Sequence, residues 1–278
     1  MTAAEKIVSL RSTIARVGLQ DAGVQTRVAL GHRGTDACLH GGLLKGALHE
    51  VFPMAAGDGA AAAGFVTVLA ARVAGGRRLL WLRPDFAALE YGEIAAPGLR
   101  ELGLDPGRFL LLRAPDVTSL LRAGFDALSC TELGALVLEI PGTPRILDLA
   151  ASRRFVLGAA QSGVTVFLLR WNAEAEPSAA ETRWLVRAGR SRADCPPSAL
   201  RATSPASGGG NICRGRTAWD WGYPLFEAEL VRNRHGRAGF WVMEWNCDDR
   251  LFRAANPGAV VSPAADRPAA AENASRIA

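Results

Sequence analysis

Residues 50–71, EVFPMAAGDGAAAAGFVTVLAA, decide the fold because they join an apolar strand, a glycine-rich turn and a helix in that order. The apolar run predicts a strand over 47–52, and the alanine-rich run predicts a helix over 60–74 that stops at Gly75 and Gly76. A strand that enters a helix through such a turn is typical of parallel α/β proteins, where it borders the ligand site.

The same alternation continues to residue 170. Further strands are predicted at RRLLWLRPD (77–85), RFLLLRAPD (108–116), ALVLEI (135–140) and VTVFLLR (164–170). Further helices are predicted over 86–102, after an N-cap at Asp116, and from an N-cap at Ser152 to Gly163. Strands that are apolar throughout and alternate with helices indicate a mostly parallel sheet with helices on both faces.

After residue 170 the pattern changes. The segments ETRWLVRAG (181–189) and PLFEAELVRNRHGRAGFWVMEW (224–245) predict longer strands with a turn at 234–236, which form a C-terminal antiparallel hairpin extending the sheet. We divide the chain into an N-terminal arm with an amphipathic helix (1–26), a core (27–253) that includes a mobile loop (190–222), and a disordered tail rich in Ala and Pro (254–278).

Composition favours an ordinary soluble protein. The 278 residues are 49% hydrophobic and 21% charged, and no apolar run is long enough to cross a membrane. The N-terminus lacks the apolar core of a secretory signal, and the five cysteines are scattered without a CxxC pair. We therefore expect a cytoplasmic protein without membrane partners, disulfides or a zinc site, and leave association with the nucleoid open.

The glycine-rich turn lacks the residues that nucleotide hydrolysis needs. A phosphate-binding loop has the pattern GxxxxGK[ST], in which the Lys contacts phosphate and the hydroxyl holds Mg²⁺. Here Gly57, Gly59 and Gly64 are present, but no Lys follows them and the first hydroxyl is Thr67. We expect a vestigial nucleotide loop, no ATP or Mg²⁺ cofactor and no enzyme activity; a plain Gly/Ala-rich turn explains the residues equally well.

Two acids lie at the ends of predicted strands, at positions where enzymes with a phosphate-binding loop place catalytic carboxylates. Glu139 ends ALVLEI, where a Mg²⁺ ligand would lie, and Asp85 follows LLWLRP, where an attacking water would be activated. A lone acid at a strand end is more often a surface or capping residue. The four histidines show neither catalytic nor metal-binding spacing, so no metal site is predicted.

Over residues 27–250 the chain resembles the RecA recombinase core, through VALG, GGLLKGALHEVF, GLDPGRFLLLRAPD, ALVLEI and VTVFLLR in that order. It resembles the RecA-like ImuA family more closely, through ASRRFVLGAAQSGVTVFLLR (151–170) and LVRNRHGRAGFWVMEWN (230–246). This resemblance implies a RecA-like accessory protein of the SOS response to DNA damage, which takes part in error-prone translesion synthesis and mutagenesis. It also implies two partners, an ImuB-like homologue of Y-family polymerases and an error-prone replicative-type polymerase subunit, with RecA as a further candidate.

Two other functions stay open at this point. One is a damage-inducible inhibitor of cell division like SulA, another RecA-derived family with a degenerate nucleotide loop. The other is an ATP-binding RecA paralogue, which the missing loop residues disfavour. The segment WNAEAEPSAAET (171–182) has three acids and no base, which disfavours DNA pairing in the manner of RecA.

Positive charge is concentrated in the C-terminal third. Ten arginines and four acids lie between Arg183 and Arg237, within a net charge of +5 for the whole chain. We consider a face that binds single-stranded DNA or a partner, with interleaved tryptophans that stack on bases. Its candidate residues are Arg183, Arg187, Arg214, Arg216, Arg232, Arg234, Arg237 and Trp241. The alternative is a solvated face above buried tryptophans, with protein partners binding the N-terminal helix or WVMEWNCDDRLF (241–252).

Overall fold

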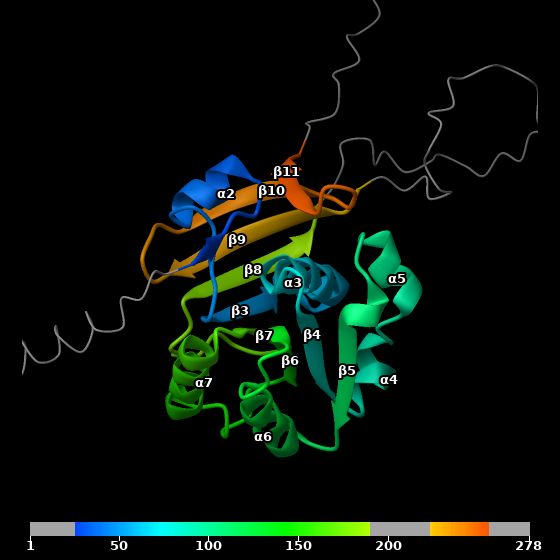
Figure 1. Cartoon of the computed structure of the whole chain (residues 1–278), viewed down its shortest axis with the longest axis vertical. Coiled ribbons are helices and arrows are strands. Elements are labelled where there is room, and N and C mark those ends of the chain that lie inside the picture. The colour runs from blue at the N-terminus through cyan, green and yellow to red at the C-terminus, as the bar shows by residue number, and fades with distance from the viewer. Residues whose placement is uncertain (1–25, 190–222, 256–278) are drawn as a thin grey trace, which may run out of the picture.

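The large sheet is built in strand order β11-β10-β9-β8-β3-β7-β6-β4-β5, and the computed structural model describes residues 26–189 and 223–255 (Figure 1). Its strands are β3 (Leu48–Pro53), β4 (Arg78–Pro84), β5 (Phe109–Ala114), β6 (Leu133–Pro141), β7 (Thr165–Trp171), β8 (Thr182–Ala188), β9 (Leu225–Asn233), β10 (Gly239–Asn246) and β11 (Leu251–Ala254). The strands from β5 to β8 pair in parallel, whereas β9, β10 and β11 pair antiparallel. The predicted mostly parallel sheet with an antiparallel C-terminal extension is confirmed.

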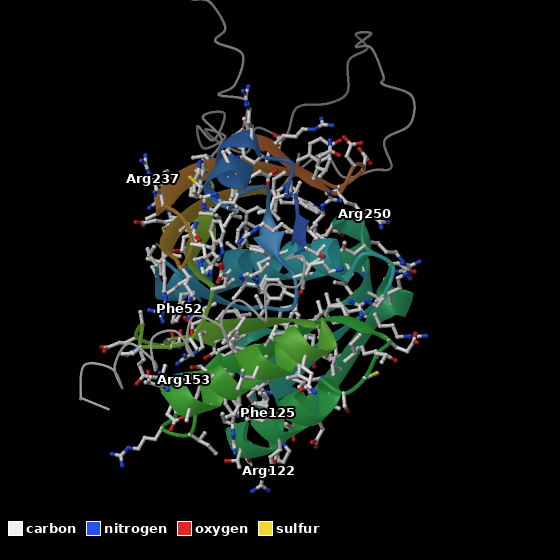
Figure 2. The ribbon with its side chains drawn as sticks, turned by 60° about the vertical axis from the view of Figure 1, so that its left-hand side comes forward. Phe52, Arg122, Phe125, Arg153, Arg237 and Arg250 are labelled. Atoms are coloured by element: carbon white, nitrogen blue, oxygen red, sulfur yellow. The ribbon has the colours of Figure 1, made fainter. Side chains whose placement is uncertain are left out.

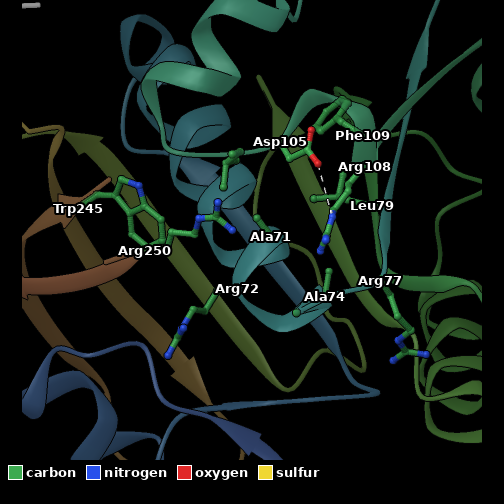
Figure 3. Close-up of a pocket in the computed structure, with 12 residues that line it drawn as sticks. Ala71, Arg72, Ala74, Arg77, Leu79, Asp105, Arg108, Phe109, Trp245 and Arg250 are labelled. Carbon is green, nitrogen blue, oxygen red and sulfur yellow. Dashed lines mark ion pairs between the residues drawn. The ribbon is translucent and has the colours of Figure 1, made fainter. Parts of the chain in front are cut away.

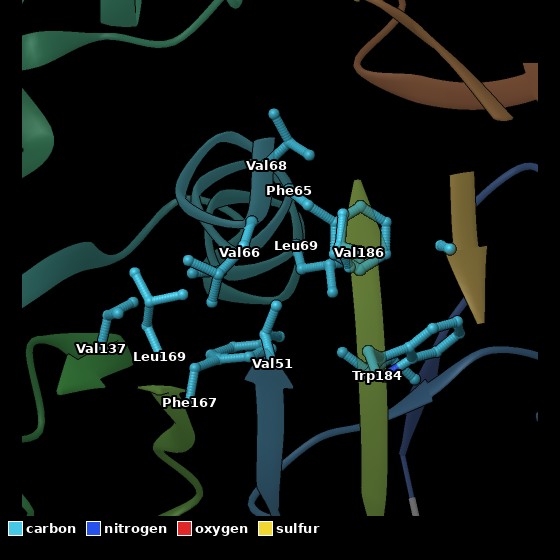
Figure 4. Packing of buried hydrophobic residues seen from close by; sticks show 14 of the residues in the cluster. Val51, Phe65, Val66, Val68, Leu69, Val137, Phe167, Leu169, Trp184 and Val186 are labelled. Atoms are coloured by element: carbon cyan, nitrogen blue, oxygen red, sulfur yellow. The ribbon is translucent and has the colours of Figure 1, made fainter. Parts of the chain in front are cut away.

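Helices cover both faces of the parallel part, as predicted. Helix α3 (Gly59–Ala74) packs on one face, while α6 (Val117–Ala127) and α7 (Leu149–Ser162) pack on the other. Alternate residues of each strand therefore enter two different cores: in β6, Val137 packs beneath α3 and Leu138 faces α6 and α7. Figure 4 shows Phe65, Val66 and Leu69 of α3 above the sheet.

The core helices begin and end where capping chemistry allows. Asp116 accepts a hydrogen bond from the Ser119 amide (2.7 Å) and caps α6 as predicted. The predicted cap of α7 is wrong by one turn: Asp148 accepts from the Ala151 amide (2.7 Å), and Ser152 lies buried inside the helix. An Asp four residues earlier offers the same hydrogen bond in front of an additional apolar turn, so the helix starts there.

The single helix predicted over 86–102 is also wrong, since two short helices occupy this range. Helix α4 (Ala87–Tyr91) ends at Gly92, whose φ of 79° a helix cannot continue through. Helix α5 (Ala96–Glu101) then starts with Pro97 in its first turn, where the ring's fixed φ is tolerated. The break matters for the site because it positions Tyr91.

Helix α3 is unusually apolar, and its burial in the core explains why. Residues Ala56–Ala74 have the length and hydropathy of a membrane span among the described residues. The side chains that produce this hydropathy, including Phe65, Val66 and Leu69, are fully buried against the sheet. The apolar character of α3 is therefore that of a core helix.

The N-terminal part of the described chain lies against the antiparallel strands. A small hairpin of β1 (Arg27–Val28) and β2 (Leu43–Leu44) encloses α2 (Arg33–Cys38), which packs on β10 (Figure 1). The predicted helix within 1–26, the predicted loop 190–222 and the predicted tail lie outside the described residues, except for the short lengths that adjoin them.

Candidate functional site

The predicted nucleotide loop lies at the carboxyl edge of the parallel strands, between β3 and α3. Its three glycines do not form one turn. Gly57 is exposed in a 3₁₀ turn, Gly59 is the buried first residue of α3, and Gly64 lies inside the helix facing Phe226. The spacing of Gly59 and Gly64 is therefore a feature of the helix surface, and a loop that wraps phosphate between them is absent from this part of the structure.

An aromatic pair lies against the start of α3. The indole of Trp171, at the end of β7, contacts Gly59 so closely that a Cβ at this position would overlap the ring. The ring of Tyr91 stacks on that indole with a centroid distance of 4.2 Å and an interplanar angle of 10°. Helix N-termini at this edge of a sheet are where α/β proteins bind phosphate. Here the space above Gly59 is filled by a side chain.

Glu139 is buried in β6 with both carboxylate oxygens engaged. The Trp81 indole N–H donates to Oε2 (2.9 Å) and the Arg83 guanidinium donates to Oε1 (3.1 Å). Burial raises the pKa of Glu139, and the two donors offset part of this effect. A carboxylate held in this way is an ion-pair partner, so the interpretation of Glu139 as a surface or capping residue is wrong. Asp85 is exposed beyond β4.

A second buried charge cluster lies on the β3–β7–β8 side of the same edge. Arg183 of β8 pairs with Glu50 of β3 at 2.7 Å, and Arg170 of β7 lies close enough for Glu50 to support its charge. The guanidinium groups of Arg170 and Arg183 each lie 5.6 Å from the centre of the Phe52 ring, within cation–π range. Burial lowers the pKa of Arg170, and Glu50 opposes that shift.

Arg183 therefore does not belong to a basic surface, contrary to the prediction. Neither Glu50 nor Arg170 was predicted to be a site residue. A carboxylate inside the apolar strand LHEVFP nevertheless indicates a buried cationic partner. The sequence cannot indicate which arginine fills that role. In the structure β8 pairs with β3, which brings Arg183 directly opposite Glu50.

The remaining candidates for the basic face are dispersed. Arg187 pairs with Glu227 on the neighbouring strand (2.6 Å), and Arg232 donates to the Ser178 carbonyl (2.7 Å). Arg234 and Arg237 are exposed at the turn after β9. Arg214 and Arg216 lie outside the described residues.

The predicted stacking tryptophans are mainly core residues where the structure describes them. Trp184 is completely buried, and Trp241 is half-buried with its ring centre 6.2 Å from that of Trp184. Their rings fill the space between the antiparallel strands, α2 and α3. Neither is presented flat to solvent, so the interpretation of Trp184 as a base-stacking residue is wrong.

The basic turn between β9 and β10 has a structural partner. The Asn233 side chain donates to the Cys38 carbonyl at the end of α2 (2.9 Å), and a His40 ring nitrogen lies 2.5 Å from the His235 carbonyl. His235 also lies 3.4 Å from the Glu181 carboxylate. These contacts hold the hairpin turn against α2, so much of RNRHGR serves to connect the two ends of the described chain.

A cavity of about 230 Å³ lies at the far end of α3, on the amino side of the strands (Figure 3). Arginines surround an apolar floor that includes Phe109 and Trp245. Two of these arginines are engaged by main-chain carbonyls: Arg72 donates to Ala29 and Arg108 to Gly76. Arginine at the C-terminal end of a helix is also favoured by the helix dipole. The presence of Arg72 and Arg108 in the cavity wall is therefore explained by the contacts that they make near the end of α3.

A second, larger space of about 380 Å³ is a surface groove beside α7. We call it the α7 groove. It is lined by residues of α7, of the segment after β7, of β9 and of the turn that follows β9: Leu149, Arg153, Val156, Leu157, Ser178, Ala179, Arg232 and Arg234. Among the described residues no group of three or more His, Cys, Asp or Glu side chains could hold a metal ion.

Comparison with known proteins finds relatives that match most of the chain. No family model matches the chain. Protein ImuA of Caulobacter vibrioides, in strain NA1000 / CB15N and in strain ATCC 19089 / CIP 103742 / CB 15, is 29% identical to this chain over 264 residues, which cover 90% of the chain and 94% of the relative. The chain is therefore similar to ImuA proteins over nearly its whole length. Among solved structures, the fold is similar to the crystal structure of the RadB recombinase, with a TM-score of 0.49 and 16% identity over 82% of this chain and all of that one. The fold class itself is assigned from the sheet described above.

The two segments that carried the resemblance to ImuA meet in the structure. Residues 151–170 form most of α7 and all but the last residue of β7, and residues 230–246 form the end of β9 and all of β10. Arg153, Val156 and Leu157 come from the first segment, and Arg232 and Arg234 from the second. The α7 groove is therefore built from both.

Proposed function

We propose that this chain is a non-catalytic accessory protein of SOS-induced, error-prone translesion DNA synthesis, and that it acts through protein partners. Similarity to protein ImuA of Caulobacter vibrioides over 90% of the chain supports the damage-inducible accessory role. The non-catalytic character and the partners are our own inferences. The partners we propose are an ImuB-like homologue of Y-family polymerases and an error-prone replicative-type polymerase subunit, with RecA as a further candidate, in the cytoplasm.

The observation that carries the non-catalytic proposal is the Trp171 indole packed on Gly59. A nucleotide at this edge would need open helix amides, a lysine and a metal-binding hydroxyl. The loop lacks the last two, and an aromatic ring occupies the space above the helix start. Glu139, the carboxylate nearest in role to a Mg²⁺ ligand, already has two donors.

Direct DNA binding has weaker support than partner binding. Of the candidate arginines in the described residues, Arg183 is buried in an ion pair, Arg187 is paired and Arg232 binds a carbonyl. Only exposed arginines with free donors contribute strongly to phosphate binding. Single-stranded DNA stays a candidate partner through Arg234 and Arg237.

Nucleotide chemistry can be tested on the purified protein. With Mg²⁺ and a fluorescent ATP analogue, we expect no saturable binding, and with radiolabelled ATP no turnover above a buffer control. Asp85→Asn and Glu139→Gln should leave this baseline unchanged. Turnover in the wild type that Glu139→Gln abolishes would overturn the non-catalytic assignment.

The complex can be tested in the organism. An affinity-tagged copy expressed from its own locus should recover the Y-family-like protein and the polymerase subunit after DNA damage, in amounts well above those recovered with a tagged unrelated protein. Recovery of the cell-division GTPase in their place would favour the SulA-like alternative.

A further inference from the structure

Helix α7 presents a second apolar row that the core does not use. One face of the helix is buried through Ala151, Phe155 and Ala159. Leu149 and Leu157 lie two turns apart on the groove side, and their exposed fractions are 38% and 67%. Exposed leucines gathered beside a groove mark an interaction site more often than leucines scattered singly.

The groove next to this row is positively charged. Arg153 lies on α7 between the two leucines, and the groove is also lined by Arg232 of β9 and by Arg234 in the turn after it. No Asp or Glu is among the described residues that line the groove. The side chains of Arg153 and Arg234 have no hydrogen-bond or ion-pair partner in the described ranges, so their donors are available. Figure 2 shows Arg153 and Arg237 along the same side of the molecule.

We propose that the α7 groove docks an amphipathic segment of a protein partner, with an apolar row facing Leu149 and Leu157 and carboxylates facing Arg153 and Arg234. This inference rests on the proposed function and names the chemistry of the partner's binding segment. An apolar side chain placed every three or four residues on the incoming segment would match the row on α7. The groove's volume lies within the range of pockets that take ligands.

The composition of the groove favours a protein segment over nucleic acid. Surfaces that bind single strands combine basic residues with aromatic rings on which bases stack. The lining of the α7 groove has three arginines but no aromatic residue, and its apolar members are aliphatic. Leucines would contribute nothing to a phosphate backbone, whereas they match the apolar centre of a protein interface with a charged rim.

The test uses the full-length chain and the purified Y-family-like partner encoded in the same organism, with binding measured by biolayer interferometry. The groove variants are Leu157→Ser and Arg153→Glu. Each has a matched control elsewhere: Leu89→Ser on α4, where the leucine is 91% exposed, and Arg122→Glu on α6, where the arginine is exposed. A single-stranded 20-mer oligonucleotide is measured in parallel, together with the sedimentation of each variant.

We expect each groove variant to weaken binding to the partner at least tenfold, and each control to change it less than twofold. Peptides that tile the partner should then locate a binding segment with spaced apolar residues and acids. If the wild type does not bind the partner at all, the proposed function fails and takes this inference with it. If it binds and the groove variants bind as tightly as the controls, the groove inference alone is wrong.

Two other outcomes would also overturn the inference. Loss of oligonucleotide binding in Arg153→Glu, with partner binding intact, would make the groove a nucleic-acid site. A wild-type dimer that Leu157→Ser converts to monomer, with partner binding intact, would make it an interface between copies of this chain.

Discussion

The carboxyl edge of the parallel strands and the α7 groove both contain arginines and apolar side chains, but these are buried at the edge and exposed in the groove. At the edge, arginines are buried against carboxylates and Phe52, and Trp171 covers Gly59. In the groove, Leu149, Leu157, Arg153 and Arg234 face solvent, and the two arginine side chains have no hydrogen-bond or ion-pair partner in the described residues. The edge, where α/β proteins ordinarily bind ligands, is packed like the core, whereas the α7 groove is exposed to solvent.

The contribution of the carboxyl edge to stability is tested most directly by removing Glu139. Glu139→Ala leaves the buried Arg83 without a counter-charge, and we expect the free energy of unfolding to fall by roughly 3–5 kcal/mol. Urea unfolding measures it. Glu93→Ala removes an exposed carboxylate 3.9 Å from the same arginine and should cost less than about 1 kcal/mol. Equal effects of the two changes would mean that the edge is not a stabilising core.

Buried charge also predicts a dependence on pH, through His49 of β3. Burial lowers its pKa from 6.5 to about 4, and its ring lies 2.8 Å from the Thr182 hydroxyl and 2.9 Å from the Leu44 carbonyl. Because the folded pKa is depressed, the stabilisation is present above pH 6.5 and is lost as the pH falls towards 4. At about 1.4 kcal/mol per pKa unit, the loss reaches roughly 3 kcal/mol.

Unfolding free energies at several pH values in this range should show that loss in the wild type. His49→Gln keeps a side chain that can hydrogen bond but does not titrate, so its curve should be flatter by the same amount. Parallel curves for the two proteins would show that His49 is not held neutral.

The aromatic cover of α3 is tested by a pair of glycines. Gly59→Ala places a Cβ inside the Trp171 ring and should destabilise the fold by roughly 1–3 kcal/mol, measured by thermal and urea unfolding. Gly57→Ala meets no atom within 4 Å and should have little effect. In a Trp171→Leu background the cost of Gly59→Ala should shrink. An unchanged cost there would mean that Trp171 is not what restricts this position.

The smallest effect on stability is expected for variants of the α7 groove. Leu157→Ser and Arg153→Glu should each change the free energy of unfolding by less than about 0.5 kcal/mol, because both side chains face solvent without partners in the described residues. Urea unfolding again measures this. A larger loss in either variant would indicate that the groove serves the fold and not a partner.

The sequence predicted the parallel core because its strands are buried on both faces and therefore read as continuous apolar runs, as in ALVLEI and VTVFLLR. The missing Lys is likewise visible without coordinates, and the absence of nucleotide chemistry stays a prediction. The sequence placed Arg183 on the surface because alternation within one strand says nothing of a carboxylate on the next strand. Pairing of β8 with β3 decides that contact.

The α7 groove was beyond prediction for a related reason. Its lining joins residues near 150, 178 and 233, and no local pattern in any of these segments reports on the other two. The arginines of LVRNRHGR are visible as a charged run, but the helix predicted from Ser152 to Gly163 leaves out Leu149 and does not indicate that Leu157 is exposed. Leu149 belongs to the helix because Asp148 caps it one turn early, and both leucines lie off the face buried through Ala151, Phe155 and Ala159.

The contact between the hairpin turn and α2 has a consequence during synthesis. Asn233 and Cys38 are 195 residues apart, and the Phe252 amide donates to the Leu30 carbonyl at a similar separation. At roughly 5–20 residues per second, a ribosome needs on the order of 10–40 seconds to make the intervening chain. Throughout that interval Leu30 and Leu39, both buried in the finished protein, lack the strands that cover them. The nascent chain therefore offers an apolar segment to chaperones until its last strands emerge.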